Sequence, residues 1–294
     1  MTRSGRRLVP VVPTALTLGN LVFGFLATAK TLDAMAAAAE DGGVFDPAFS
    51  ARILQACWFI VAAMVCDALD GRVARMMDAA TPFGGQLDSL ADMVTFGVAP
   101  ALMAKVVYMH TLESLGLAVH AGVVTLLCSL FLVGAGLRLA RFTVANEPDE
   151  ESHDTFLGLP TPAAAATVVA ACFFAFEGRL ELGLDPETAD TIGTWVLRGL
   201  PATAALLGVL MVSHVRYVHL FQRYVRARAP AATIVKLVLA AWLVAAFKEW
   251  ILLPGALLYV GGGLLLWLRA RSRGRRVTDV LPAAPPEEEE EPVA

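Results

Sequence analysis

The stretch that decides the fold runs from Cys66 to Gly97 and reads CDALDGRVARMMDAATPFGGQLDSLADMVTFG. It places five aspartates and two arginines among residues that are otherwise mostly apolar or small. An ionisable group in an apolar helix is costly unless it is paired, hydrated or bound to a metal ion. These charged residues are therefore candidates for function, and the apolar segments around them set the fold class.

Four of the aspartates are spaced so that they can converge from two helices. Asp67 and Asp70 are three residues apart and share one helix face. Asp88 and Asp92 are four residues apart and share a face of the next helix. Residues 78–84, which read DAATPFG, indicate a turn between the two helices. An antiparallel pair with so short a turn is expected to bring the four carboxylates together at one depth, near the cytosolic surface.

Four neighbouring carboxylates cannot all stay ionised without a cation. Oxygen-rich sites favour hard divalent ions such as Mg²⁺ or Mn²⁺, and a two-metal arrangement suits displacement at phosphorus. Gly71 and Gly84 leave room for close approach of a nucleotide or phosphate, and Arg75 can hold a phosphate oxygen. The alternative interpretation is a buried ion-pair network of the aspartates with Arg72 and Arg75.

Outside this stretch the composition is that of a membrane protein. Of the 294 residues, 57% are hydrophobic and 17% are charged, with a mean hydropathy of +0.63. Soluble domains average about 45–50% apolar and about 25% charged residues. A disordered chain, a fibrous protein and a nucleic-acid binder are excluded. The four cysteines are isolated in apolar segments, so neither a disulfide framework nor a zinc–thiolate site is expected.

The apolar segments predict an all-α, polytopic integral membrane bundle of about eight transmembrane helices, because a helix needs ~20 mostly apolar residues to cross a bilayer. The candidate spans cover residues 14–38, 49–77, 83–109, 114–142, 160–178, 191–213, 231–248 and 250–268. Most of the 23 lysines and arginines fall in one alternate set of loops. Basic loops face the cytosol, so both termini and the aspartates are expected on the cytosolic side of the cell or inner membrane.

The spacing of the charged stretch resembles the motif of the CDP-alcohol phosphotransferase family at every fixed position: Asp67-x2-Asp70-Gly71-x2-Ala74-Arg75-x8-Gly84-x3-Asp88-x3-Asp92. Members of this family are integral membrane enzymes that transfer a phosphatidyl or phosphoalcohol group from a CDP-linked donor to an alcohol, with release of CMP. The resemblance implies that Asp67, Asp70 and Asp88 bind the metal ions, two in number. It implies that Asp92 is the general base and also contacts a metal. Nucleotide-binding residues implied by the resemblance are Asp70, Gly71, Ala74, Arg75 and Gly84.

Further stretches resemble the phosphatidylserine synthase branch of the family. They are PTALTLGNLVFGF (13–25), GLRLARFTV (136–144) with FLGLPTPAAAA (156–166), and LMVSHVRY (210–217). One departure is Thr143, where that branch commonly has asparagine. The resemblance implies transfer of the phosphatidyl group from CDP-diacylglycerol to L-serine, giving phosphatidylserine and CMP, by a homodimer in the membrane without a nucleic-acid partner.

Three polar residues are candidates for contact with the substrate. Arg138 and Arg141 are three residues apart at the cytosolic end of span 114–142, and an arginine fork is a good partner for the serine carboxylate. Orientation signals or anchors for lipid phosphates are equal alternatives for this pair. Asn20, near the start of the first span, can contact nucleotide or substrate, or instead make an interhelical hydrogen bond.

These patterns divide the chain into four regions. They are a basic N-terminal cytosolic segment (1–13), a six-helix catalytic domain (14–217), a C-terminal helix pair with basic flanks (218–276) and a disordered acidic tail (277–294). Two alternative functions stay open. The first is the same chemistry with glycerol 3-phosphate or inositol phosphate as the acceptor. The second is a metal-ion transporter, which would place the aspartates near the bilayer midplane.

Overall fold

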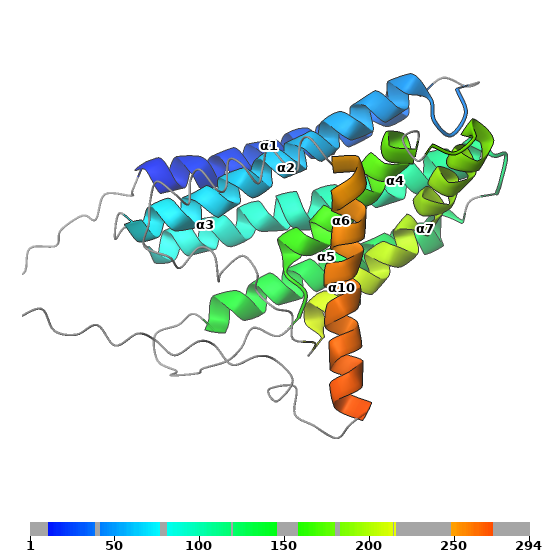
Figure 1. Ribbon diagram of the computed structural model, residues 1–294. Helices are drawn as coiled ribbons and strands as arrows, with labels where there is room; N and C mark the ends of the chain where they lie inside the picture. The colour runs from blue at the N-terminus through cyan, green and yellow to red at the C-terminus, as the bar shows by residue number, and fades with distance from the viewer. Residues whose placement is uncertain are drawn as a thin grey trace, which may run out of the picture.

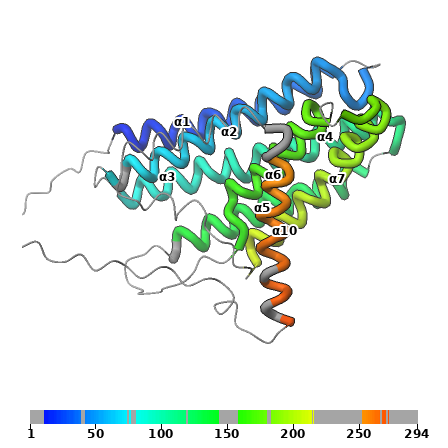
Figure 2. Tube along the Cα trace, viewed as in Figure 1, coloured from blue at the N-terminus to red at the C-terminus, as the bar shows by residue number. Residues whose placement is uncertain are grey.

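The computed structural model of the chain describes residues 11–38, 42–76, 81–118, 120–145, 158–179, 183–213, 215 and 248–272. Within these ranges the chain is helical and contains no strand. Figures 1 and 2 show an elongated bundle whose helices run roughly alongside one another, with the C-terminal helix crossing their direction. The bounds of the elements are α1 (Val11–Ala37), α2 (Pro47–Met76), α3 (Pro82–Asp92), the π-helix η1 (Met93–Val98), α4 (Ala99–Ser114), α5 (Ala121–Ala145), α6 (Thr161–Phe176), α7 (Pro186–Val212) and α10 (Lys248–Ser272).

Six helical segments of the described chain are long and apolar enough to cross a membrane, and α6 is a shorter apolar helix. The six cover Val11–Ala37, Pro47–Val73, Pro82–Ser114, Ala121–Thr143, Pro186–Val212 and Leu252–Arg269. The chain is therefore a polytopic helical membrane protein, as the composition predicts. The predicted span 231–248 lies outside the described residues except at its last position, and so do residues 1–10 and the predicted acidic tail.

Three predicted span boundaries were wrong. The span predicted to begin at 191 begins at Pro186, and the other two boundaries lie on either side of Gly116. The span predicted at 83–109 is divided into α3, η1 and α4, and it continues to Ser114. The following span was predicted to begin at 114, but α5 begins at Ala121. The reason is Gly116, whose φ of 66° lies in the left-handed region that glycine adopts without strain. This glycine ends α4, and the apolar residues after it form the connection rather than a helix.

The buried face of α1 is a single stripe with alternating steps of three and four residues, which is the period of one helix face. Its members are Pro13, Thr17, Asn20, Gly24, Ala27, Thr31 and Ala34. All are small or polar, so α1 approaches its neighbours closely. It packs mainly against α2 and also contacts α3, η1 and α4.

Helices α5 and α7 cross at a pair of glycines. A Cβ at Gly134 would lie 2.3 Å from the carbonyl oxygen of Gly208, and a Cβ at Gly208 would lie 2.3 Å from that of Leu130. No side chain fits in either position without separating the helices. Close contact through small residues is how membrane helices associate when there is no hydrophobic driving force between them.

Candidate metal centre

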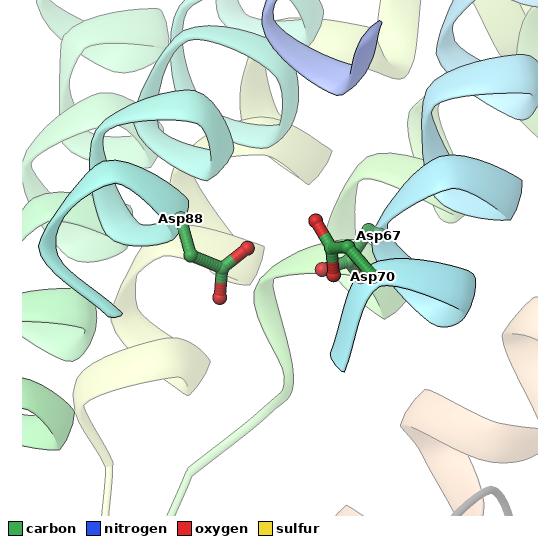
Figure 3. Close-up of side chains that lie close together, drawn as sticks. All are labelled: Asp67, Asp70 and Asp88. Atoms are coloured by element: carbon green, nitrogen blue, oxygen red, sulfur yellow. The ribbon is translucent and has the colours of Figure 1, made fainter. Parts of the chain in front are cut away.

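Three of the four aspartates in the motif lie together at one end of the bundle. One carboxylate oxygen from each of Asp67, Asp70 and Asp88 lies within 4.8 Å of the others. The first two project from the last turns of α2 and the third from α3, and Figure 3 shows the two sets facing each other. Asp70 is buried, with 4% of its surface exposed, and the other two are half-buried.

A helix cap fixes the start of α3, and with it the position of Asp88. The Thr81 hydroxyl accepts a hydrogen bond of 3.0 Å from the backbone N–H of Gly84, and Pro82 occupies the first turn, where a missing N–H costs nothing. A Cβ at Gly84 would lie 3.2 Å from the Thr81 hydroxyl oxygen. The glycine therefore has a structural reason to be there, in addition to the nucleotide role that the resemblance implies.

Two of the three aspartates, Asp67 and Asp88, have no ion pair among the described side chains. The Oδ1 atom of Asp88 is also buried without a hydrogen-bond partner among the described residues. Arg72, only 8% exposed, pairs with none of the aspartates, and its Nη1 also has no partner in the described part of the chain. The ion-pair alternative is therefore not supported for Arg72. Carboxylate oxygens in this arrangement fit a hard divalent cation.

Asp92 lies outside this group of three. It is buried, 9% exposed, and its Oδ1 accepts a hydrogen bond of 3.0 Å from the Nδ2 of Asn20. Directly after it, η1 widens the helix, with the N–H of Ala99 donating to the carbonyl of Val94 five residues earlier. Pro100 follows and has no N–H to donate to the preceding turn, which favours such a widening. Short π-helical turns occur frequently at functional sites.

The comparisons with known proteins agree with the motif. Residues 10–197, more than half of the chain, match a model described as CDP-alcohol phosphatidyltransferase. The chain belongs to this family. The resemblance derived from the motif is thus confirmed, and the matched region extends from the start of α1 into α7.

Several curated relatives carry the name CDP-diacylglycerol–serine O-phosphatidyltransferase. The Helicobacter pylori protein is 36% identical over 170 residues, 58% of this chain and 63% of the relative. The Bacillus subtilis protein is 32% identical over 163 residues, 55% of this chain and 75% of the relative. The Methanocaldococcus jannaschii protein is 32% identical over 167 residues, 57% of this chain and 65% of the relative. The chain thus spans less than two thirds of the first and last of these relatives.

Three further residues of the motif, Gly71, Ala74 and Arg75, lie on α2 after Asp70. Gly71 lies in α2 directly after Asp70. Ala74 and Arg75 lie in the next turn of the same helix, and their side chains are outside the described part of the chain. The nucleotide-binding role of these residues therefore stays a prediction.

The two candidate acceptor arginines differ in their surroundings, although they are close in sequence. Arg141 is exposed, whereas Arg138 is half-buried, and its Nε has no hydrogen-bond partner among the described residues. Arg138 also lies close enough to Asp92 for an electrostatic interaction. The sequence alone could not distinguish Arg138 from Arg141, because their spacing does not show which side chain points toward the aspartates.

Two contacts around the site were missed by the sequence interpretation. The Thr17 hydroxyl of α1 lies 2.8 Å from Asp70 Oδ2. The hydroxyl of Thr143, the residue that departs from the branch pattern, lies 3.3 Å from that of Ser89, which ties α5 to α3 beside Asp88. The signal for Thr17 was its place three residues before Asn20 on the buried stripe of α1.

Proposed function

We propose that this chain transfers the phosphatidyl group of CDP-diacylglycerol to L-serine, giving phosphatidylserine and CMP. The observation that carries the proposal is the cluster of Asp67, Asp70 and Asp88, built by the family motif on two adjoining helices. Family membership supports the reaction class, and the names of the relatives support serine as the acceptor. No feature of the described site favours another acceptor alcohol or a transporter.

The metal-binding residues in this proposal are Asp67, Asp70, Asp88 and Asp92. They would hold two divalent ions, Mg²⁺ or Mn²⁺, which neutralise charge on the diphosphate and on the departing CMP. The clustering of Asp67, Asp70 and Asp88 and the buried Oδ1 of Asp88, which has no hydrogen-bond partner among the described residues, support this assignment. Gly71, Ala74, Arg75 and Gly84 are proposed to line the CDP site.

The chemical step is a direct displacement at the phosphorus that bears diacylglycerol. Asp92 accepts the proton of the serine hydroxyl while the serine oxygen forms a bond to that phosphorus. The bond between the same phosphorus and the CMP oxygen breaks, and CMP leaves with the electron pair. Asp92 suits this role because it is buried beside the cluster and already oriented by Asn20.

Serine is distinguished from a phosphorylated acceptor by its carboxylate, which needs a cationic partner. Arg138 and Arg141 are the proposed partners, and a guanidinium binds a carboxylate through two parallel hydrogen bonds. The half-buried position of Arg138 and its electrostatic interaction with Asp92 favour it as the direct contact. Arg141, which is exposed, is the outer member of the pair.

The orientation of the protein and its oligomeric state belong to the same proposal. The site end of the bundle faces the cytosol, where serine and CMP are soluble, and the lipid donor enters from the membrane. Two copies form a homodimer, as the family resemblance implies. The variant Gln86→Cys places a thiol at an exposed position at the site end. In sealed vesicles, this thiol should react with a membrane-impermeant reagent added on the cytosolic side and not with the same reagent added on the opposite side.

The assay for this function uses the purified full-length chain with CDP-diacylglycerol labelled in the CMP moiety. Serine, glycerol 3-phosphate and inositol phosphate are supplied one at a time, with Mg²⁺ or Mn²⁺. We expect CMP release and a phosphatidylserine product with serine alone. Release that depends on another alcohol, with none in the presence of serine, would contradict the acceptor assignment and leave the reaction class intact.

A further inference from the structure

Two of the three polar side chains on the buried stripe of α1 lie at the site end. Thr17 and Asn20 are three residues apart and therefore share one helix face. Each is buried, with Asn20 fully inaccessible to solvent. Both side chains contact an aspartate of the motif, but the two aspartates come from different helices. This one face of α1 thus contacts both halves of the carboxylate site.

Thr17 contacts the half contributed by α2. Its hydroxyl oxygen lies 2.8 Å from Asp70 Oδ2 and 3.1 Å from the carbonyl oxygen of Pro13. The single hydroxyl proton can be donated fully to only one of these acceptors, and the ionised carboxylate is both closer and stronger. Donation to Oδ2 restrains the rotation of the Asp70 carboxylate, which is one of the three that make up the cluster.

Asn20 contacts the half contributed by α3. Its Nδ2 donates to Asp92 Oδ1 at 3.0 Å, and its backbone carbonyl accepts a hydrogen bond of 3.1 Å from the Thr95 hydroxyl in η1. Asn20 is thus hydrogen-bonded both to Asp92 and to Thr95, one helical turn after it. A Cβ at Gly24 would overlap Thr95, so the close approach of α1 to η1 depends on this glycine.

We infer that Thr17 and Asn20 are positioning residues, and that α1 acts as a template that holds Asp70 of α2 and Asp92 of α3 in fixed relative orientation. A carboxylate that has one oxygen held by a neutral donor keeps its other oxygen directed at a metal ion or at the serine hydroxyl. Partners of this kind change metal affinity or activity by about 10–100-fold when they are removed. The catalytic part of this inference rests on the proposed function, whereas the metal-affinity part does not.

The first arm of the test measures the affinity for Mn²⁺ alone. Thr17→Val removes the hydroxyl at nearly constant side-chain volume, whereas Thr17→Ser keeps the hydroxyl and removes only the methyl group. The matched control is Thr31→Val, because Thr31 is fully buried on the same stripe and donates only to the Ala27 carbonyl in its own helix. We expect Thr17→Val to weaken Mn²⁺ binding about 10-fold, Thr17→Ser to bind like wild type, and Thr31→Val to have no effect on binding.

The second arm separates kcat from KM for serine. Asn20→Leu removes the amide at similar volume, and Asn20→Ser gives a smaller variant in case the first does not fold. We expect kcat to fall about 10–100-fold, while KM for serine changes little. A rise in KM for serine at unchanged kcat would overturn the positioning role, because it would mean that Asn20 binds the acceptor directly.

Other results also decide the inference. Mn²⁺ affinity of Thr17→Val equal to that of Thr31→Val, or failure of Thr17→Ser to restore it, would overturn the role of Thr17. Should the wild-type chain release no CMP with serine, the proposed function fails. The Mn²⁺ arm would still test the template, since it needs no substrate.

Discussion

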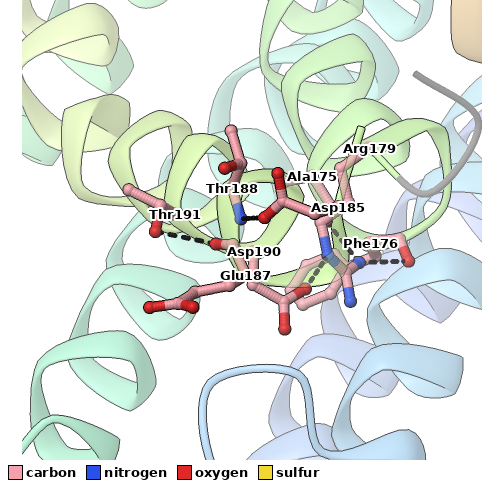
Figure 4. A network of polar contacts seen from close by, with 8 residues as sticks. All are labelled: Ala175, Phe176, Arg179, Asp185, Glu187, Thr188, Asp190 and Thr191. Atoms are coloured by element: carbon pink, nitrogen blue, oxygen red, sulfur yellow. Dashed lines mark hydrogen bonds and ion pairs between the residues drawn. The ribbon is translucent and has the colours of Figure 1, made fainter. Parts of the chain in front are cut away.

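The two ends of the bundle differ in whether their buried charged side chains have a partner of opposite charge. At the end away from the aspartates, Arg179 donates from Nε to Asp190 at 2.8 Å and from Nη1 to the carbonyls of Ala175 and Phe176 at 2.7 Å. The same guanidinium lies 3.5 Å from the ring centroid of Phe45, and Figure 4 shows its polar contacts. At the site end, Asp67 and Asp88 have no cationic partner among the described side chains.

This difference distinguishes a charged residue that stabilises the fold, Arg179, from charged residues that are proposed to bind a ligand, Asp67 and Asp88. A buried charge destabilises a protein unless it is paired and hydrogen-bonded, as Arg179 is. Asp67 and Asp88 have no such ion pair among the described side chains, and in the proposed function a divalent cation supplies the missing positive charge. A substitution at one end of the bundle should therefore have a different effect from a matched substitution at the other end.

The largest effect is expected from removing one charge at each end. Asp88→Asn should lower serine-dependent CMP release by about 10³-fold, equivalent to about 4 kcal/mol in the activation barrier, because it removes a metal ligand. Asp190→Asn should leave kcat unchanged, because Asp190 pairs with Arg179 at the end of the bundle away from the aspartates. Comparable kcat values for the two variants would remove the distinction between the ends.

Divalent ions should stabilise the protein only through the site end. Adding Mg²⁺ or Mn²⁺ at 100 times its Kd should stabilise wild type by about 2.7 kcal/mol for each bound ion, and Asp190→Asn by the same amount. Asp88→Asn should gain little. In a chelator, Asp88→Asn should melt at or above the wild-type Tm, because one uncompensated carboxylate has been removed. A thermal-shift series in detergent measures these values, and a lower Tm for Asp88→Asn in chelator would contradict the account.

The opposite pattern is expected for Arg179→Met. This variant keeps the apolar stem but loses two hydrogen bonds to carbonyls and the contact with Phe45, for a destabilisation of about 1–3 kcal/mol. The ion pair adds little, because the Asp190 side chain is 49% exposed. The Tm should fall, while kcat measured well below the Tm should not. A loss of kcat at unchanged Tm would place Arg179 in the catalytic machinery and contradict this assignment.

The smallest effects are expected from two similar helix caps. Thr81→Ala removes the cap of α3, which carries Asp88, at a cost of about 1 kcal/mol. It should weaken Mn²⁺ binding a few-fold. Asp185→Ala removes the cap of α7, where the Asp185 carboxylate accepts from the Thr188 N–H at 2.9 Å. That variant should lower the Tm slightly and leave Mn²⁺ affinity unchanged.

The Asp185 cap also has a pH dependence that the Thr81 cap lacks. The hydrogen bond from the Thr188 backbone N–H lowers the pKa of the Asp185 carboxyl. A lowered pKa means that the stabilisation is present above the pKa of the unfolded chain and is lost as the pH falls through the folded value. The Tm difference between wild type and Asp185→Ala should therefore shrink at acidic pH, whereas that for Thr81→Ala should not change in this way.

Much of the fold and the centre of the site could be predicted from sequence, because both depend on local spacing. Hydropathy shows the membrane helices, and the spacing of Asp67, Asp70 and Asp88 shows that their side chains face one another once two helices are joined by a short turn. The Gly116 turn and the π-helix after Asp92 were not predicted. Their signals, a lone glycine and Pro100, are compatible with several backbone conformations.

The partners of the aspartates could not be predicted for a different reason. Whether Asn20 reaches Asp92 depends on the rotation and height of α1 against α3, which are set by the close approach at Gly24. The distinction between Arg138 and Arg141 depends in the same way on the rotation of α5. Sequence periodicity gives the face of a helix, but not its register against a neighbour.

The most direct test of the account is a Mn²⁺ titration of the purified full-length chain, with free Mn²⁺ measured by electron paramagnetic resonance. Wild type and Asp190→Asn should each bind two ions per chain with equal affinity, and Asp88→Asn should bind far more weakly. No binding by wild type, or equal binding by wild type and Asp88→Asn, would contradict the claim that the uncompensated end of the bundle is completed by divalent cations.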